Sequence, residues 1–208
     1  MSNPKKFAET LALLVMLSVS LSTARAQDTK LRWDIISVQF TTPNIISPGG
    51  FASVWAHFAN GQPRLKATFT GSGTFSPWDP TDVTGGGTVV IRRWVPAQMR
   101  LEDVATLTYT VTALVSWVLD SPQPEGSGIN RVTNTTAADF RNGLAVFHIV
   151  YSDGSRGVLN VSCDGPGGSV DPYEGVNATK GTVTFSHQEA PFPNIDAGRT
   201  VFVVVRQP

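Results

Sequence analysis

The chain has 208 residues, of which 16 are Lys or Arg and 16 are Asp or Glu, so its formal charge at neutral pH is zero. A chain without an excess of basic residues has no electrostatic reason to bind nucleic acid or an anionic membrane surface. The single cysteine, Cys163, excludes an intramolecular disulfide, so stability must come from a hydrophobic core. We expect its thiol to be buried as a small apolar group.

The first 26 residues have the order of a secretory signal peptide. A basic pair at residues 5 and 6 precedes a mainly apolar run over residues 11–21, and an Ala-Arg-Ala sequence ends at residue 26. The apolar run is well short of the roughly 20 residues that span a bilayer, so we expect no transmembrane anchor. The sequence therefore predicts a secreted or periplasmic protein in which residues 1–26 are removed and residues 27–208 form a single β domain.

Glycine and proline divide the rest of the chain into short segments. All 19 glycines and 13 of the 14 prolines lie in this part, clustered between runs of β-branched and aromatic residues, which is typical of strands joined by turns. From the N-terminus, strands are expected over residues 31–40, 51–59, 64–75 and 88–95. Glycines at positions 71 and 73 alternate within the third of these strands and favour a bend of the kind found at a barrel corner.

The clearest strand lies over residues 104–119. Tyr109, Val111, Val115 and Trp117 fall on one face with a period of two, and threonines fall on the other face. This alternation predicts a half-buried strand whose apolar face lies toward the core. The segment after it, residues 121–128, is expected to be a surface loop.

Further strands are expected in the second half of the chain. They lie over residues 144–151 and 157–163, which flank an Asp-Gly hairpin signal, and over residues 175–187 and 200–206. Short helical pieces are expected only near residues 96–103 and 134–141. About nine strands without a long helix predict an all-β fold, a single antiparallel β-barrel, with a two-sheet β-sandwich as the alternative.

The sequence contains no pattern for a metal or a cofactor. The three histidines, His57, His148 and His187, lack metal-ligand spacing, and the glycine runs lack the lysine and the helix of a phosphate loop. No nucleophile elbow is present, so no catalytic residue is assigned. A tight hairpin would place His148 opposite residue 159 and Cys163 opposite residue 144, too far apart for a thiol–imidazole pair.

Three residues are candidates for contact with a ligand: Trp78, His148 and Tyr109. Trp78 lies in a proline-bounded loop beside Asp79, where an indole can stack on a sugar ring or hold an apolar molecule. The alternative role for Trp78 is a plug that closes one end of the β structure. His148 is expected in the core or on the barrel lining, and Tyr109 lies on the apolar face of the strand over residues 104–119.

Several segments resemble a group of exported bacterial proteins of unassigned function. They are GSGTF (71–75), DVTGGGT (82–88), YSDGSRGVLNVSC (151–163) and EGVNATKGTVTF (174–185). The resemblance covers residues 68–205 and implies a secreted all-β protein, although residues 92–93 and 95–103 depart from the group's pattern. A fainter likeness to the dirigent and allene oxide cyclase barrels would imply eight strands around an apolar cavity.

Three functions remain open from the sequence. Binding of a small apolar or aromatic ligand is favoured, because several strands are apolar on both faces and no catalytic motif is present. The first alternative is a barrel enzyme of the cyclase kind, with His148 or Glu174 as its ionisable group. The second is a surface module that recognises carbohydrate or another protein through exposed aromatic residues such as Trp78.

Overall fold

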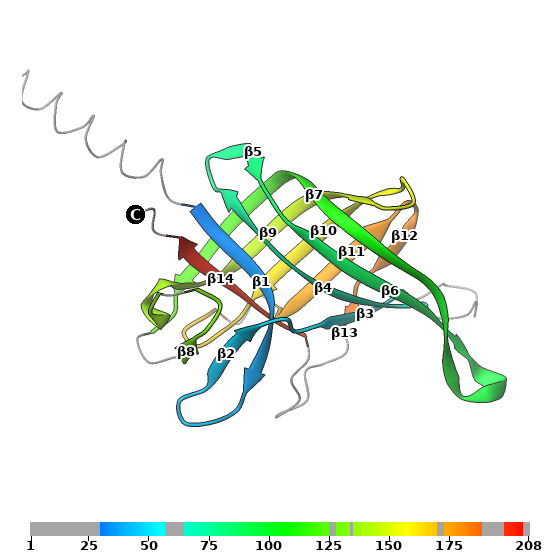
Figure 1. Ribbon diagram of the computed structural model, residues 1–208, viewed down its shortest axis with the longest axis horizontal. Coiled ribbons are helices and arrows are strands. Elements are labelled where there is room, and N and C mark those ends of the chain that lie inside the picture. The colour runs from blue at the N-terminus through cyan, green and yellow to red at the C-terminus, as the bar shows by residue number, and fades with distance from the viewer. Residues whose placement is uncertain are drawn as a thin grey trace, which may run out of the picture.

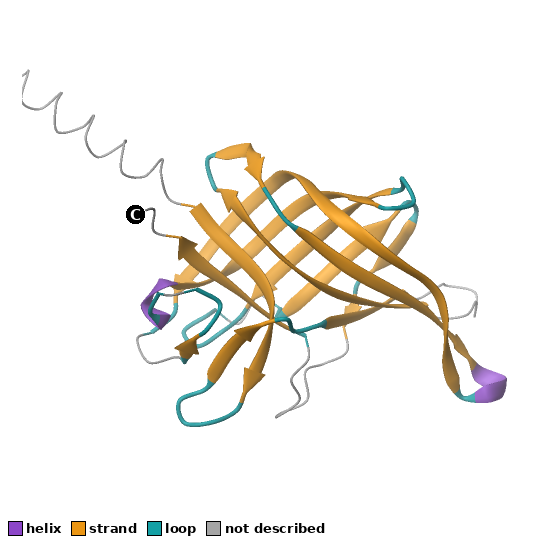
Figure 2. Ribbon diagram, in the orientation of Figure 1, coloured by secondary structure: helices purple, strands orange, loops and turns teal. Residues whose placement is uncertain are grey.

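The computed structural model describes residues 30–56, 65–124, 128–133, 135–169, 173–188 and 198–205. The expected signal peptide and His57 lie outside these residues. The described part of the chain forms 14 strands and two short 3-10 turns, and contains no helix that is long and apolar enough to cross a membrane. The prediction of an all-β barrel is therefore confirmed (Figures 1 and 2).

Six antiparallel strands form a closed ring. Each strand pairs with the next one around the ring, and the last pairs with the first. A closed ring leaves no open sheet edge along its circumference. In this circular order the strands are β1 (Lys30–Gln39), β4 (Leu65–Ser76), β6 (Gly86–Val95), β7 (Arg100–Pro122), β9 (Phe140–Tyr151) and β14 (Arg199–Val205).

Eight further strands extend the ring. They are β2 (Ile45–Pro48), β3 (Ala52–Ala56), β5 (Asp79–Val83), β8 (Ile129–Asn130), β10 (Arg156–Cys163), β11 (Gly175–Lys180), β12 (Val183–Phe185) and β13 (His187–Gln188). One edge of β4 pairs with β3 along its first half and with β1 along its second half. In the same way, one edge of β9 pairs with β14 at its start and with β10 along the rest of its length. The path from β10 through β11 and β12 reaches β13, which pairs with β3, so these strands add a second wall to the barrel.

Aromatic side chains fill the interior of the barrel. Trp33, Phe75, Phe147 and Phe202 come from four different ring strands, and all four are fully buried. The ring centroids of Trp33 and Phe147 are 5.5 Å apart, and those of Phe75 and Phe202 are 6.1 Å apart. Tilted and edge-on contacts at these distances add to the stabilisation that burial of the rings provides. Space for a ligand is therefore found at the ends of the barrel and on its outer surface.

Strand β7 is longer than expected, and bulges change which of its side chains point inward. Three register shifts interrupt its pairing with β9, and each adds one residue to β7. As a result Leu114 is buried, whereas Val115 is 52% exposed. The prediction that Val115 shares the inner face with Trp117 is wrong for this reason.

The segments that were expected to be helical contain no α-helix in their described residues, and each has one short 3-10 turn and continues into a strand. Residues 96–103 form the tip of a hairpin arm between β6 and β7, in which η1 (Pro96–Gln98) is a single 3-10 turn (Figure 2). Residues 134–141 include a second turn, η2 (Ala137–Asp139), just before β9. Neither segment buries an apolar stripe wide enough to stabilise an α-helix.

The strand count exceeds the expected nine for two reasons. The strands β2, β5 and β8 have two to five residues each, which is too short for alternation to show in the sequence. The single strand expected over residues 175–187 is divided into β11, β12 and β13, with a turn at Gly181, which has a φ of 56°.

Candidate functional site

A cleft of about 600 Å³ opens at the end of the barrel where β4 turns into β5. We call it the end cleft. Six of its seven lining residues are apolar, and the seventh is an arginine. They come from four ring strands and from the turn between β4 and β5, and they are Leu31, Pro77, Trp78, Trp117, Leu119, Arg141 and Val204.

The turn after β4 holds Trp78 at the rim of the end cleft. Trp78 is 65% exposed, and its backbone N–H donates to the hydroxyl of Ser76 at 3.3 Å. The carboxylate of Asp79 accepts hydrogen bonds from the backbone and the hydroxyl of Thr81, and these bonds lower the pKa of Asp79. The turn is thereby fixed by local hydrogen bonds, so an exposed indole is presented without support from the core.

Trp117 forms the wall between the end cleft and the barrel core. Its ring packs edge-on against Phe202 and Phe75, with centroid distances of 4.6 and 5.4 Å. Gly143 on the neighbouring strand β9 leaves room for this indole, because a Cβ at this position would lie 2.8 Å from Cη2 of Trp117. One edge of the indole is therefore held by the core while the residue still lines the cleft.

Arg141 brings the only charge to the lining of the end cleft. Its Nη1 donates to the carbonyl oxygens of Ala138 and Phe140, at 2.9 and 2.7 Å. No carboxylate in the described part of the chain forms an ion pair with it. The guanidinium is thus positioned by neutral oxygens, and its charge is left uncompensated beside an apolar surface.

The three candidate residues from the sequence do not share a site. Trp78 lines the end cleft, whereas Tyr109 is buried in the core, where its hydroxyl donates to the carbonyl of Thr70 at 2.9 Å. Burial raises the pKa of Tyr109 well above its ordinary value, so it stays neutral. Sequence reasoning missed Trp117 as a cleft residue, and it missed Arg141 because no local pattern marks an arginine on a strand as unpaired.

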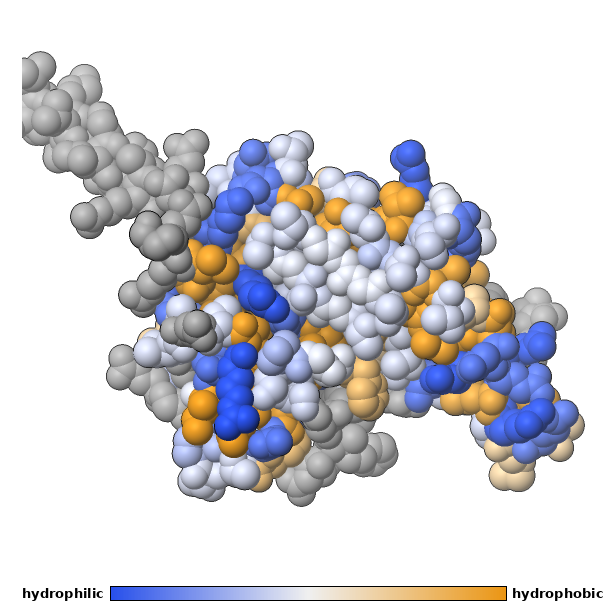
Figure 3. All heavy atoms as spheres, viewed as in Figure 1, coloured by the Kyte–Doolittle hydropathy of each residue, from blue (hydrophilic) through white to orange (hydrophobic). Residues whose placement is uncertain are grey.

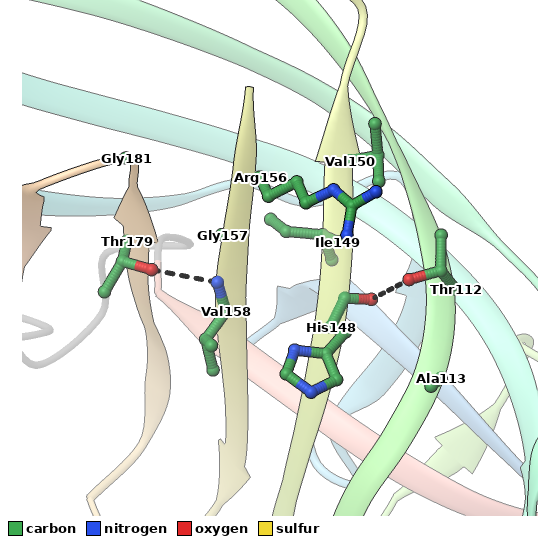
Figure 4. A pocket seen from close by; sticks show the side chains of 10 residues that line it. All are labelled: Thr112, Ala113, His148, Ile149, Val150, Arg156, Gly157, Val158, Thr179 and Gly181. Carbon is green, nitrogen blue, oxygen red and sulfur yellow. Dashed lines mark hydrogen bonds between the residues drawn. The ribbon is translucent and has the colours of Figure 1, made fainter. Parts of the chain in front are cut away.

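His148 lies on the outer surface, so its expected place in the core or on the barrel lining is wrong. The neighbours of His148 on β9, Phe147 and Ile149, point inward, and period-two alternation turns the imidazole outward. His148 lines a depression of about 610 Å³ on the outer face of β7, β9, β10 and β11, which we call the sheet groove (Figure 4). The sheet groove is also lined by Thr112, Ala113, Ile149, Val150, Arg156, Gly157, Val158, Thr179 and Gly181.

A third pocket, of about 90 Å³, contains Glu174. The two carboxylate oxygens of Glu174 accept hydrogen bonds from the backbone N–H groups of Asp164 and Thr200, at 2.6 and 2.5 Å. Burial raises the pKa of Glu174 to about 7, although both hydrogen bonds oppose the shift. A pocket of this volume has room for only a few water molecules, so Glu174 has no space for a substrate and the enzyme hypothesis stays a prediction.

Cys163 is buried, as expected, and it is far from His148. In the hairpin of β9 and β10, His148 pairs with Val158 and Cys163 pairs with Gly143, one position away from the expected register. The thiol lies inside the barrel wall while the imidazole lies outside it. A thiol–imidazole pair is therefore excluded by both distance along the hairpin and side-chain direction, as the sequence had led us to expect.

Comparisons with known proteins identify no relative of this chain. In the described part of the chain, no three His, Cys, Asp or Glu side chains come together as a possible metal site. No family model matches the chain, and no curated protein or solved structure is significantly similar to it. The geometry of the clefts is therefore what indicates a function.

Proposed function

We propose that the protein binds a small amphipathic molecule in the end cleft, with an aromatic or aliphatic body and a carboxylate or similar anionic group. The observation that carries this proposal is the meeting of two tryptophans with an arginine that has no carboxylate partner, in one cleft of about 600 Å³. Ligand sites of this kind are mostly apolar, with a few polar groups that fix orientation.

The apolar part of the ligand would lie against Trp78 and Trp117. The volume of the end cleft falls within the range of roughly 300–1,000 Å³ that small-molecule sites occupy. Trp78 is 65% exposed, so a ligand that covers it removes apolar area from water and is stabilised in proportion to that area. Trp117 is already oriented by Phe202, so binding would order few additional side chains.

The anionic group would bind Arg141. A guanidinium presents a planar fork that matches two carboxylate oxygens, and such charge-assisted pairs are stronger than neutral hydrogen bonds. The bonds from Nη1 to Ala138 and Phe140 leave further N–H groups of Arg141 to donate to a ligand. The preference for an anion is therefore the most specific consequence of the proposal.

We further propose that the protein acts after export. The support is the order of basic pair, apolar run and Ala-Arg-Ala in the first 26 residues. The test is an intact mass measurement of the protein purified from its own host. A mass that corresponds to a chain beginning at Gln27 supports export, and a mass that retains the first 26 residues contradicts it.

The binding proposal is tested by titration of tryptophan fluorescence with 1-naphthoate and with 1-naphthamide, its neutral counterpart. We expect saturable quenching by both, with the carboxylate bound about tenfold more tightly. Arg141→Gln should abolish the preference for the carboxylate, and Trp78→Ala should weaken both ligands. Met99→Ala, at the exposed tip of the hairpin arm, is the matched control and should change neither affinity. Equal affinity of the wild type for the two ligands would contradict the role of Arg141, and absence of saturable binding would refute the site.

A further inference from the structure

The sheet groove is separate from the end cleft and has a different chemical character. It lies on the outer face of the barrel wall, and its lining combines aliphatic side chains with hydroxyl groups, an imidazole and a guanidinium. Figure 4 shows that Arg156 extends from β10 toward β9 and that the ring of His148 projects from β9 between these strands. The groove is therefore open to solvent and carries polar and charged groups above an aliphatic floor.

The charge of the sheet groove is positive. Arg156 is exposed, and no carboxylate in the described ranges forms an ion pair with it. The nearest acidic residue along the hairpin, Asp153, is bound to Lys180 at 2.6 Å. Hydrogen bonds from Lys180 and Ser155 lower the pKa of Asp153 to about 2, so its charge is matched by that of Lys180. An anionic group in the groove would thus meet Arg156 without competition.

Hydroxyl groups stand on both sides of Arg156 and His148. The hydroxyl of Thr112 donates to the carbonyl oxygen of His148 at 3.2 Å, so the lone pairs of the Thr112 hydroxyl oxygen can accept a hydrogen bond from a ligand. The hydroxyl of Thr179 accepts from the backbone N–H of Val158 at 2.9 Å, so its own hydrogen remains to be donated. The two threonines therefore offer one acceptor and one donor beside the guanidinium.

The hydroxyl surface continues beyond the groove along β7. Thr106, Thr108, Thr110 and Thr112 are all exposed on the outer face of this strand. The register places Thr88 of β6 beside Thr108 and Thr70 of β4 beside Thr88. Figure 3 shows the corresponding middle of the face over β4 and β6 as a broad area that is neither strongly hydrophilic nor strongly hydrophobic. This part of the outer face therefore presents hydroxyl groups rather than charged side chains.

We propose that the sheet groove binds a carboxylated sugar, namely a uronic acid unit of an extracellular polysaccharide. The carboxylate would form a bidentate pair with Arg156, and the sugar hydroxyls would bond to Thr112, Thr179 and His148. The C–H face of the sugar would lie on Val150 and Val158, and the neighbouring sugar units would follow the threonines of β7. Nucleic acid is a poorer fit because the chain has equal numbers of basic and acidic residues.

A protein partner is also a poorer fit to the sheet groove. Protein interfaces are centred on buried aromatic or large aliphatic anchors, and no such side chain projects from the groove in the part of the chain that the structure describes. The polar groups are instead spaced around a shallow aliphatic floor. A repeating, hydroxyl-rich chain with one carboxylate per unit matches both features.

The test is affinity measurement with oligogalacturonate and with its methyl ester, in which the same sugars carry no charge. At physiological salt we expect the acid form to bind at least about tenfold more tightly than the ester. Arg156→Gln should lower the affinity for the acid form about tenfold and remove the difference between the two. Because Arg156 is exposed, the variant should fold, which its circular dichroism spectrum and melting temperature would check.

Two controls separate the sheet groove from general electrostatics and from the end cleft. Arg92→Gln removes an equal charge from the hairpin arm, where Arg92 pairs with Asp103 at 2.8 Å, and should leave binding unchanged. Trp78→Ala, in the end cleft, should also leave it unchanged. Equal affinities for acid and ester, an equal loss in Arg92→Gln and Arg156→Gln, or equally tight binding of polyphosphate would each overturn the proposal.

Discussion

The indole of Trp117 lies edge-on to the ring of Phe202 with 4.6 Å between the ring centroids, so the wall of the end cleft packs directly against the barrel core. Phe202 is fully buried on β14, which closes the ring between β1 and β9. A ligand that binds in the end cleft would therefore touch Trp117, whose ring packs on the core residues Phe202 and Phe75.

The two tryptophans of the end cleft should differ sharply in their effect on stability. We expect Trp117→Ala to lower the free energy of unfolding by roughly 3 kcal/mol, because it removes contacts with Phe202 and Phe75 and leaves a cavity. Trp78→Ala should change it by less than about 0.5 kcal/mol, because Trp78 is 65% exposed. Guanidinium chloride unfolding of both variants measures the difference. Similar losses in the two would show that Trp78 supports the core.

Glu174 should make the protein less stable as the pH rises toward neutral. Its folded-state pKa of about 7 exceeds its ordinary value of 4.5, so the folded protein holds this proton more tightly than the unfolded chain does. The stabilisation is fully present below pH 4.5 and is lost as the pH rises through 7, by at most about 3 kcal/mol.

Denaturant unfolding of the wild type and of Glu174→Gln between pH 4.5 and pH 8 tests this expectation. The variant should lack the pH-dependent difference, although it should be less stable throughout because an amide cannot accept from both Asp164 and Thr200 through oxygen. If the wild type instead gained stability over the variant with rising pH, the two backbone hydrogen bonds would outweigh burial of the carboxylate.

The thiol of Cys163 should be inert in the folded protein. The side chain is 1% exposed, and burial raises the pKa of the thiol well above its ordinary value, which suppresses the reactive thiolate. We expect no rapid reaction with a disulfide reagent such as Ellman's reagent in buffer, and reaction of one thiol per chain in denaturant. Rapid reaction under native conditions would mean that the end of β10 opens locally.

Gly73 should be intolerant of any side chain. A Cβ at this position would lie 2.1 Å from the carbonyl oxygen of Thr84 and 2.8 Å from Nε1 of Trp33. Because the nearer atom belongs to the backbone, Gly73→Ala should cost more than about 2 kcal/mol in unfolding free energy. Gly181→Ala is the control, since nothing lies within 4 Å of its Cβ and only its φ of 56° opposes the change, at a cost of about 1 kcal/mol. Equal effects would mean that β4 can shift to relieve the overlap.

Local sequence patterns were sufficient for the strands that lie against the core. The strand expected over residues 31–40 is β1 (Lys30–Gln39), and the one expected over residues 157–163 is β10 (Arg156–Cys163). Runs of β-branched and aromatic residues between turn residues mark these strands, whereas alternation within a strand indicates only which residues lie on the same face, because both strands are buried at consecutive positions. The same alternation misplaced His148, since it shows which residues share a face without showing which face is inside.

The sequence by itself therefore determined the all-β class, the positions of most strands and the burial of Cys163. Only the tertiary structure decided that the strands close into a ring, where the bulges of β7 fall, and which residues meet in the end cleft. Leu31, Trp117, Arg141 and Val204 come from strands far apart in the chain and are brought together by ring closure. Register between such strands depends on packing across the whole barrel, and no local run of residues contains that information.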